Sequence, residues 1–301
     1  MKKCYLMIDV GGTGIKVNSI EADGGLIFNE NKHYPSRSDG SKEIILENLK
    51  LILLTNYDVL SEMRYDIAGI GIAFPGPFDY ENGVSLIKGL RKYDAIYGVN
   101  LKVEIDNWLK EAFSISLPVI FENDATAFGL GEFYHLKEKV RGIGITLGTG
   151  CGSSFIADNR ICRTGYGLND QGMIYDTPLK NGVIDDYLSS KGLSFIQESL
   201  GEVPLSGAEL FLLASRGDKN AYDIFEKFGE LIGEALLPFI ERFSPDELVF
   251  GGEIAGSYHF FKKGVLKVIG DHNLKTRVTQ NTSLATYKGL YYLIQTKSRE
   301  C

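Results

Sequence analysis

The first hundred residues alternate between short apolar runs and one helical pattern. Residues 4–10 form an apolar run that ends at a glycine pair, which predicts a buried strand. Residues 14–20 and 25–30 are further strand candidates, and the Asp-Gly-Gly turn between them favours a β-meander. Apolar residues then recur at helical spacing over 41–56, where Ser41 is placed to cap a helix.

The next segments predict alternating strands and helices. Residues 67–74 form an apolar run that ends at two prolines, and residues 101–113 suit an amphipathic helix. A strand at 119–121 leads into a helix from Ala125 to about Leu136. We therefore expect mixed α/β structure rather than an all-helical chain.

The second half repeats this organisation in outline, because it also begins with strands around a glycine turn. A long amphipathic helix and a late strand follow, and a helix closes the chain. The expected segments are strands at 141–147, 152–157 and 248–250, and helices at 221–243 and about 283–296.

Composition fits a two-domain globular protein. The chain has 301 residues, of which 44% are hydrophobic and 24% charged. The net charge of -7 argues against nucleic acid or an anionic membrane as a partner. It leaves phosphate binding open, because a local nest of backbone N–H groups can hold an anion. No apolar run approaches ~20 residues, so we expect no membrane span.

Cysteine and histidine usage argues against a disulfide framework and a zinc site. The histidines are scattered without metal-binding spacing. The cysteines form no Cys-x-x-Cys pair, which suits a reducing cytoplasm. They are Cys4, Cys151, Cys162 and Cys301.

Four short motifs have residue types suited to chemistry. The first is Asp9-Val10-Gly11-Gly12-Thr13, after a strand. Glycines let backbone N–H groups approach a phosphate, and Asp9 could hold a hydrated Mg²⁺. The alternative is a plain hairpin turn with an exposed aspartate.

The second motif is Gly148-Thr149-Gly150-Cys151-Gly152, between two strands. It has the same logic of a backbone cradle, and its alternative is a glycine-rich hairpin. It lacks the Lys and Ser or Thr of a Walker A loop, and it does not open a helix as a Rossmann fingerprint does.

The third motif is Glu122-Asn123-Asp124-Ala125, at a strand end before a helix. Asn and Asp are favoured helix caps, which is the structural alternative. The functional interpretation is a carboxylate that accepts a proton from a sugar hydroxyl. Phosphoryl transfer needs such a residue together with positioning and charge neutralisation.

The fourth motif is Val249-Phe250-Gly251-Gly252-Glu253, a buried strand that ends in two glycines. The flat face of a nucleotide base could lie against bare backbone there. The alternative is an ordinary strand followed by a turn.

The order of these motifs along the chain closely resembles the ROK family of sugar kinases and repressors, within the sugar kinase/actin superfamily. The resemblance covers most of the chain. It runs through Asp9-Gly11-Gly12-Thr13, Gly71-Ile72-Ala73-Phe74-Pro75-Gly76-Pro77, Glu122-Asn123-Asp124-Ala125-Thr126-Ala127 with Gly131-Glu132, Leu147-Gly148-Thr149-Gly150-Cys151-Gly152, and Gly251-Gly252.

The resemblance implies a two-domain, actin-like (ribonuclease H-like) α/β fold with a cleft between the domains. We expect an N-terminal domain over residues 1–117 and a C-terminal domain over 118–282. Residues 283–301 are expected to form a helix that packs back on the N-terminal domain.

The resemblance also implies ATP-dependent phosphorylation of a sugar hydroxyl, at the 6-hydroxyl of a hexose, an amino sugar or a β-glucoside. Asp124 would be the general base, and Gly76, Asn123 and Asp170 would contact the sugar. The expected ATP-binding residues are Asp9, which would face Mg²⁺ through water, with Gly11, Gly12, Thr13, Gly148, Thr149, Gly150, Gly251 and Gly252.

The chain departs from the family pattern in two places. Many members carry Gly-Glu-x-Gly-His and then a zinc-binding cysteine cluster, but here Asp170 replaces the Glu and Met173 the His. No cysteine cluster follows, so no zinc is expected. The common Lys after the first Gly-Gly-Thr is Gly14, which leaves Lys16 as an alternative.

Two alternatives share the fold. One is a sugar-binding sensor without catalysis, suggested by Asp170 and Met173. The other is an actin-like polymer or chaperone ATPase, which has no need for Asn123-Asp124 in a sugar site. ROK repressors add an N-terminal helix-turn-helix, which this sequence does not show before its first strand, so we do not expect DNA binding. A homodimer is the commonest assembly for such proteins.

Overall fold

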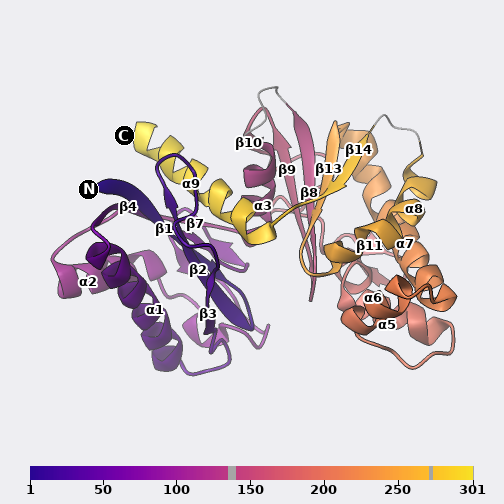
Figure 1. The fold of residues 1–301 in the computed structure, drawn as a ribbon, viewed down its shortest axis with the longest axis horizontal. Coiled ribbons are helices and arrows are strands. Elements are labelled where there is room, and N and C mark those ends of the chain that lie inside the picture. The colour runs from indigo at the N-terminus through magenta and orange to yellow at the C-terminus, as the bar shows by residue number, and fades with distance from the viewer. Residues whose placement is uncertain (135–139, 271–273, 301) are drawn as a thin grey trace. The chain divides into compact units, whose positions relative to one another are not determined.

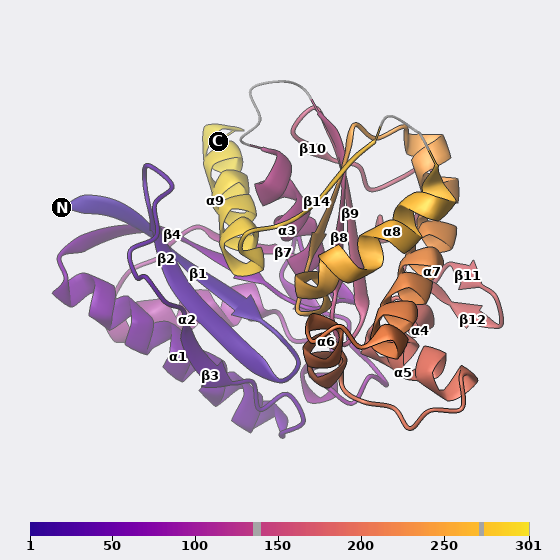
Figure 2. The same ribbon diagram turned by 45° about the vertical axis from the view of Figure 1, so that its right-hand side comes forward.

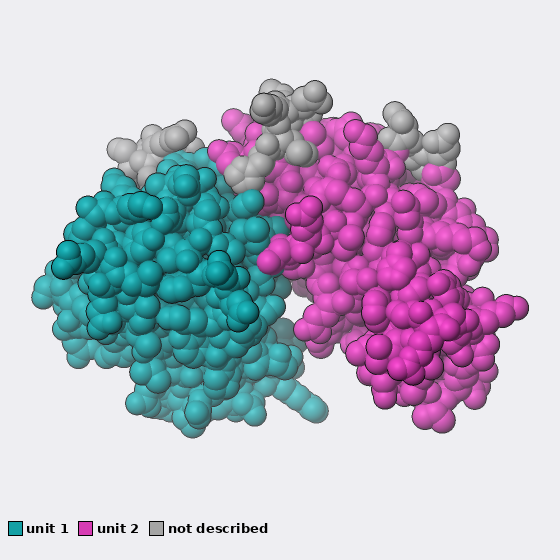
Figure 3. Space-filling model, in the orientation of Figure 1, with its two compact units in different colours: residues 1–127, 283–301 teal, residues 128–282 magenta. Residues whose placement is uncertain are grey.

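The computed structural model describes residues 1–134, 140–270 and 274–300. The chain forms two compact units, coloured separately in Figure 3. Unit 1 contains residues 1–127 and 283–301, and unit 2 contains residues 128–282. Unit 1 thus extends beyond the end at residue 117 that the sequence suggested.

Unit 1 is built on a five-stranded sheet in the order β3-β2-β1-β4-β7 (Figure 1). The first three strands are antiparallel neighbours, whereas β4 and β7 run parallel to β1. Because β7 hydrogen-bonds to β4, the segment after residue 117 belongs to this sheet. The strands are β1 (Lys2–Val10), β2 (Gly14–Glu21), β3 (Lys32–Pro35), β4 (Tyr65–Ala73) and β7 (Val119–Glu122).

Helices cover both faces of this sheet (Figure 2). On one face, α1 (Lys42–Glu62) and α2 (Leu101–Phe113) bury apolar side chains against the strands. Ser41 and Asn100 cap these helices by accepting N–H bonds from Ile44 and Val103. Short elements complete the unit: β5 (Phe78–Asp79), β6 (Val84–Ser85) and the 3₁₀ turn η1 (Asp94–Ile96).

On the other face lies α9 (Thr282–Glu300), which returns to the first strands of the chain. Its approach depends on glycine. A β-carbon on Gly289 would collide with the carbonyl oxygen of Ala127, and one on Gly71 of β4 would lie 2.9 Å from Cβ of Leu290. Close backbone packing therefore holds α9 against unit 1.

The expected strand at 25–30 is wrong. Only the bridge between Ile20 and Leu26 pairs there, and β3 begins at Lys32. The buried side chain of Asn18 explains the interruption, because its amide donates to the carbonyl oxygens of Phe28 and Glu30. These backbone groups bond to a side chain instead of a strand ladder.

Unit 2 repeats the sheet topology in the order β10-β9-β8-β13-β14. Its first three strands in sequence, β8, β9 and β10, are antiparallel neighbours, and β13 and β14 run parallel to β8. The strands are β8 (Arg141–Leu147), β9 (Cys151–Ala157), β10 (Arg160–Ile161), β13 (Glu247–Gly251) and β14 (Lys275–Val278).

A long helix, α7 (Lys219–Phe243), forms the core of unit 2 with α8 (Tyr258–Ile269). The two helices approach closely because a β-carbon on Gly229 or Gly264 would collide with the facing backbone. No helix in the described residues has the length and apolar composition of a bilayer-crossing segment. The remaining elements are α3 (Asp124–Phe133), β11 (Pro178–Leu179), β12 (Gly182–Val183), α4 (Ile184–Tyr187), α5 (Ser190–Ser199), α6 (Gly207–Ser215) and η2 (Ile254–Ser257).

Candidate functional site

The carboxyl ends of three parallel strands meet at one edge of the unit 1 sheet. Asp9 of β1 stands in register with Ala73 of β4, and Ala73 stands in register with Glu122 of β7. Asp124 follows Glu122 by two residues and opens α3. The fold therefore brings Asp9 and Asp124 to the same edge, where α/β sheets commonly bind ligands.

The sequence left two roles open for Asn123 and Asp124, namely capping a helix and accepting a proton from a hydroxyl. The side-chain oxygen of Asn123 accepts hydrogen bonds from the N–H groups of Ala125 (2.9 Å) and Thr126 (3.1 Å), so Asn123 caps α3. Asn123 is only 6% exposed. Asp124 is exposed, and its carboxylate accepts hydrogen bonds from the N–H of Ala125 and from the side chain of Asn123.

Both carboxyl groups are shifted toward the protonated form. Burial and, to a smaller extent, the charge of Asp124 raise the pKa of Asp9 to about 6, and the charge of Lys16 opposes this shift. Lys16 is the residue opposite Asp9 on β2. Desolvation of the Asp124 carboxyl by the surrounding protein raises its pKa too, although the residue as a whole is exposed. Raised carboxyl pKa values at a sheet edge are typical of functional sites.

The first glycine turn, Gly11–Gly14, is fixed by hydrogen bonds that the carbonyl groups of Gly11 and Gly12 accept from side chains. Ser36 and Ser38 donate their hydroxyls to the carbonyl oxygen of Gly12 at 2.8 and 2.6 Å. The hydroxyl of Tyr93 donates to the carbonyl oxygen of Gly11 at 3.0 Å. A bond from Gly11 N to Gly14 O at 2.9 Å closes the turn.

These bonds also set the direction of the N–H groups. In a planar trans peptide, the N–H points opposite to the preceding carbonyl. The N–H of Gly12 therefore points away from Tyr93, and the N–H of Thr13 points away from the two serines. This arrangement is suited to a phosphate oxygen.

The sugar-contacting residues suggested for unit 1 lie near the same strand ends. Asn123 directs its amide toward the hydroxyl of Tyr80 at 3.4 Å, and that hydroxyl donates to the carbonyl oxygen of Phe74. Gly76 follows β4 and is half-buried.

In unit 2, the second glycine loop contacts an acidic side chain. The N–H of Cys151 donates to Oδ1 of Asp185 at 2.7 Å, and a β-carbon on Gly150 would lie 2.8 Å from the same oxygen. The carbonyl of Gly148 accepts from Ser190 N at 2.9 Å, so the N–H of Thr149 points away from α5. Thr149 is exposed, and its N–H is the group of this loop best placed for a phosphate.

The pair Gly251-Gly252 has a packing role within unit 2. A β-carbon on Gly251 would lie 2.6 Å from the ring of Phe128. Gly252 has a φ of 85°, and a β-carbon there would collide with the backbone of Leu147. Its N–H donates to the hydroxyl of Thr282 at 3.0 Å.

Asp170 and Met173 lie in a turn organised by Asn169. The side-chain oxygen of Asn169 accepts from the N–H groups of Gln171 (3.0 Å) and Met173 (2.9 Å). Asp170 is exposed, whereas Met173 is buried in unit 2. Met173 therefore has a packing role.

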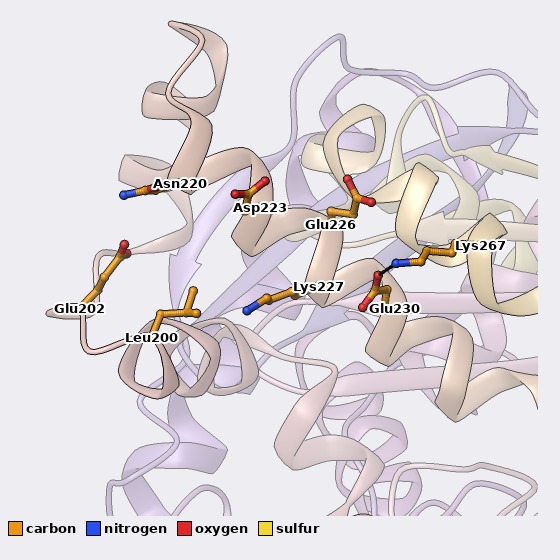
Figure 4. A pocket seen from close by; sticks show the side chains of 8 residues that line it. All are labelled: Leu200, Glu202, Asn220, Asp223, Glu226, Lys227, Glu230 and Lys267. Atoms are coloured by element: carbon orange, nitrogen blue, oxygen red, sulfur yellow. Dashed lines mark hydrogen bonds and ion pairs between the residues drawn. The ribbon is translucent and has the colours of Figure 1, made fainter.

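One hollow in unit 2 contains none of the sequence-predicted site residues. It has a volume of about 610 Å³ and lies along α7, with Lys267 of α8 at its side. Figure 4 shows Lys267 directed at Glu230, and the two groups pair at 2.5 Å. Its lining is an ion-paired, solvated surface, formed by Leu200, Glu202, Asn220, Asp223, Glu226, Lys227, Glu230 and Lys267. Within the described ranges, no group of three or more His, Cys, Asp or Glu side chains is arranged to hold a metal ion.

Sequence reasoning missed the residues that approach the glycine turns from distant segments. Tyr93 and the two serines bind the first turn, and Asp185 binds the second. The spacing Ser36-x-Ser38 is a weak signal because such pairs are common in loops. No local pattern marks Tyr93 or Asp185.

Comparison with known proteins finds sugar kinases that are similar to this chain over most of its length. An N-acetyl-D-glucosamine kinase from Citrobacter koseri is 24% identical over 274 residues, covering 83% of this chain and 84% of that protein. A glucokinase structure from Parabacteroides distasonis matches with a TM-score of 0.77 at 19% identity, covering 98% of both chains. A Streptomyces griseus ROK glucokinase in complex with glucose and AMPPNP matches with a TM-score of 0.72 at 20% identity, covering 96% of this chain and 98% of that one.

These structural matches confirm the expected actin-like α/β fold class. The repeated sheet topology of the two units agrees with it. The model of the ROK family matches residues 5–285, which is nearly the whole chain. The chain therefore belongs to the ROK family.

Proposed function

We propose that this protein is an ATP-dependent sugar kinase in which Asp124 is the general base. The substrate is a hexose, an amino sugar or a β-glucoside, phosphorylated at its 6-hydroxyl. One observation carries the proposal: an exposed carboxylate with a raised pKa shares a sheet edge with Asp9 and the first glycine turn.

The chemistry of phosphoryl transfer requires these parts. A base works best when its pKa lies near the operating pH, so the raised pKa of Asp124 suits proton abstraction from a hydroxyl. The N–H groups of Gly12 and Thr13 are directed to hold phosphate oxygens. Little covalent chemistry is left to the protein beyond this positioning.

Asp9 fits a hydrated Mg²⁺. This ion prefers carboxylate and water oxygens, and a carboxyl with a pKa of about 6 is ionised at neutral pH. When bound, Mg²⁺ neutralises charge on the phosphates. Lys16, opposite on β2, keeps Asp9 from a larger pKa shift.

In unit 2, we assign Gly148, Thr149 and Gly150 to phosphate binding through the outward N–H of Thr149. Gly251 and Gly252 are assigned to the border of the adenosine, although Phe128 covers the side of Gly251 where a β-carbon would lie. The exposed Asp170 is assigned to the sugar.

The relatives support the choice of substrates. The similarity to an N-acetyl-D-glucosamine kinase makes acetylated amino sugars the first class to test. The glucose complex of a structural relative makes glucose the second.

The test is a panel of sugars with ATP and Mg²⁺, in which ADP release is measured for wild type and Asp124→Asn. At least one sugar should raise ADP release, and Asp124→Asn should lower that rate by about 100-fold or more. Asp58→Asn is the matched control, because Asp58 is an exposed aspartate on α1 of the same unit. The proposal fails if no sugar stimulates turnover, or if Asp124→Asn turns over like wild type. Saturable sugar binding without turnover would instead indicate a sugar-binding sensor that has no catalytic activity.

A further inference from the structure

We propose that Lys92 is a phosphate-binding residue of the first glycine turn. Its side chain lies across Gly12: a β-carbon on Gly12 would collide with Cδ of Lys92 and would lie 2.6 Å from Nζ. Glycine at this position thus leaves room for the ammonium group. The inference rests on the proposed function for the assignment of a phosphate to this turn.

The backbone at Lys92 is fixed by its neighbour. Tyr93 is fully buried, its N–H donates to the carbonyl oxygen of Ser38 at 2.6 Å, and its ring packs 5.1 Å from that of Phe74. The hydroxyl of Tyr93 reaches Gly11 of the same turn. Lys92 itself is exposed, so the fixed backbone presents its ammonium group to solvent beside the turn.

The charges near the turn leave this cation available. Lys16 faces Asp9 across the β1–β2 ladder and lowers the pKa of that carboxyl. The residue after Thr13 is Gly14, which has no charge. Lys92 makes no ion pair with another of the residues that the structure describes.

An ammonium beside outward N–H groups forms a complete anion site. Lysine supplies a compact charge with three donors on a flexible stem, which suits a phosphate that approaches from solvent. Hydrogen bonds to charged groups contribute more than neutral ones. Loss of this charge should weaken ATP binding while the sugar site is left intact.

The experiment compares wild type with Lys92→Met, Lys92→Arg and Lys88→Met. Methionine keeps the length and packing over Gly12 but removes the charge. Lys88 is the matched control, since it lies in the same segment with its ammonium 5.4 Å from the Tyr97 ring centroid. Calorimetry with Mg²⁺ and AMPPNP measures nucleotide affinity without turnover, and steady-state kinetics measures KM for ATP and for the sugar.

Lys92→Met should weaken AMPPNP binding and raise KM for ATP by about 10- to 100-fold, with KM for the sugar unchanged. Lys92→Arg should recover most of the loss, and Lys88→Met should behave as wild type. Wild-type nucleotide affinity in Lys92→Met, or equal losses in the two lysine-to-methionine variants, overturns the inference. If AMPPNP binding depends on Lys92 but no sugar is turned over, the kinase proposal fails and the phosphate site stands.

Discussion

The charge of Asp124 raises the pKa of Asp9, and the two residues stand at the ends of β7 and β1 with only β4 between them. Two like charges at one sheet edge oppose each other. Folding alone gives no reason to place them there, and Lys16 offsets only part of the effect. Such a conflict is expected where a site must bind cations and accept protons.

Asp9 should make the stability of the protein depend on pH in a direction opposite to that of most aspartates. Its pKa is about 6 in the folded protein and 3.8 ordinarily, so folding favours its protonated form. The resulting stability is present below about pH 4 and is lost as the pH rises through about 6. Asp9→Asn should therefore gain about 1–2 kcal/mol over wild type at pH 8, and little at pH 4. Urea unfolding at both pH values measures this difference.

Asp106→Asn is the control with the opposite sign. Lys110 and Ser116 hydrogen-bond to Asp106 and lower its pKa, so its contribution is present above its ordinary pKa and is lost as the pH falls. That variant should lose stability at pH 8. If Asp9→Asn is no more stable than wild type at pH 8, the folded protein does not raise the pKa of Asp9, and this prediction is wrong.

Asn123 and Asp124 should respond differently to substitution, although they are adjacent. Asn123→Ala removes the acceptor for two buried N–H groups at the start of α3, which should cost about 1–2 kcal/mol of stability. Asp124→Asn keeps a side-chain oxygen that can accept the N–H of Ala125, so it should leave stability within about 0.5 kcal/mol of wild type at pH 5. Chemical denaturation measures both.

Asn123→Ser is the conservative variant, because serine also caps helices. It should restore most of the stability that alanine loses. If Asn123→Ala is as stable as wild type, the capping role assigned to Asn123 is wrong.

Local pattern was sufficient for seven strands of the two sheets, namely β1, β2, β4, β7, β8, β9 and β13. The apolar run at residues 4–10 is β1, and the helical spacing at 221–243 lies within α7. The fold class and family also followed from motif order. Helix α1 was predicted only to residue 56 but continues to Glu62, because Leu60 adds to its buried face.

Contacts between segments that are distant in the sequence could not be predicted from local sequence patterns. Lys92 and Asp185 reach glycine turns that lie far away in the sequence, and no periodicity encodes those approaches. Helix α8 and strand β14 were also missed. Their positions depend on packing against α7 and on pairing with β13.

Asp185 should stabilise the second glycine loop through one hydrogen bond. Cys151 is 4% exposed, so its N–H has no access to water if the acceptor is removed. Asp185→Ala should lower stability by about 1–3 kcal/mol, whereas Asp185→Asn keeps an oxygen in place and should lose less. Asp186→Ala is the neighbouring control; its partners are the exposed Lys191 and the N–H of Val183, which is less buried than that of Cys151, so a smaller loss is expected. Thermal and urea unfolding of the three variants should rank Asp185→Ala lowest, and a loss in Asp186→Ala as large as in Asp185→Ala would contradict this role.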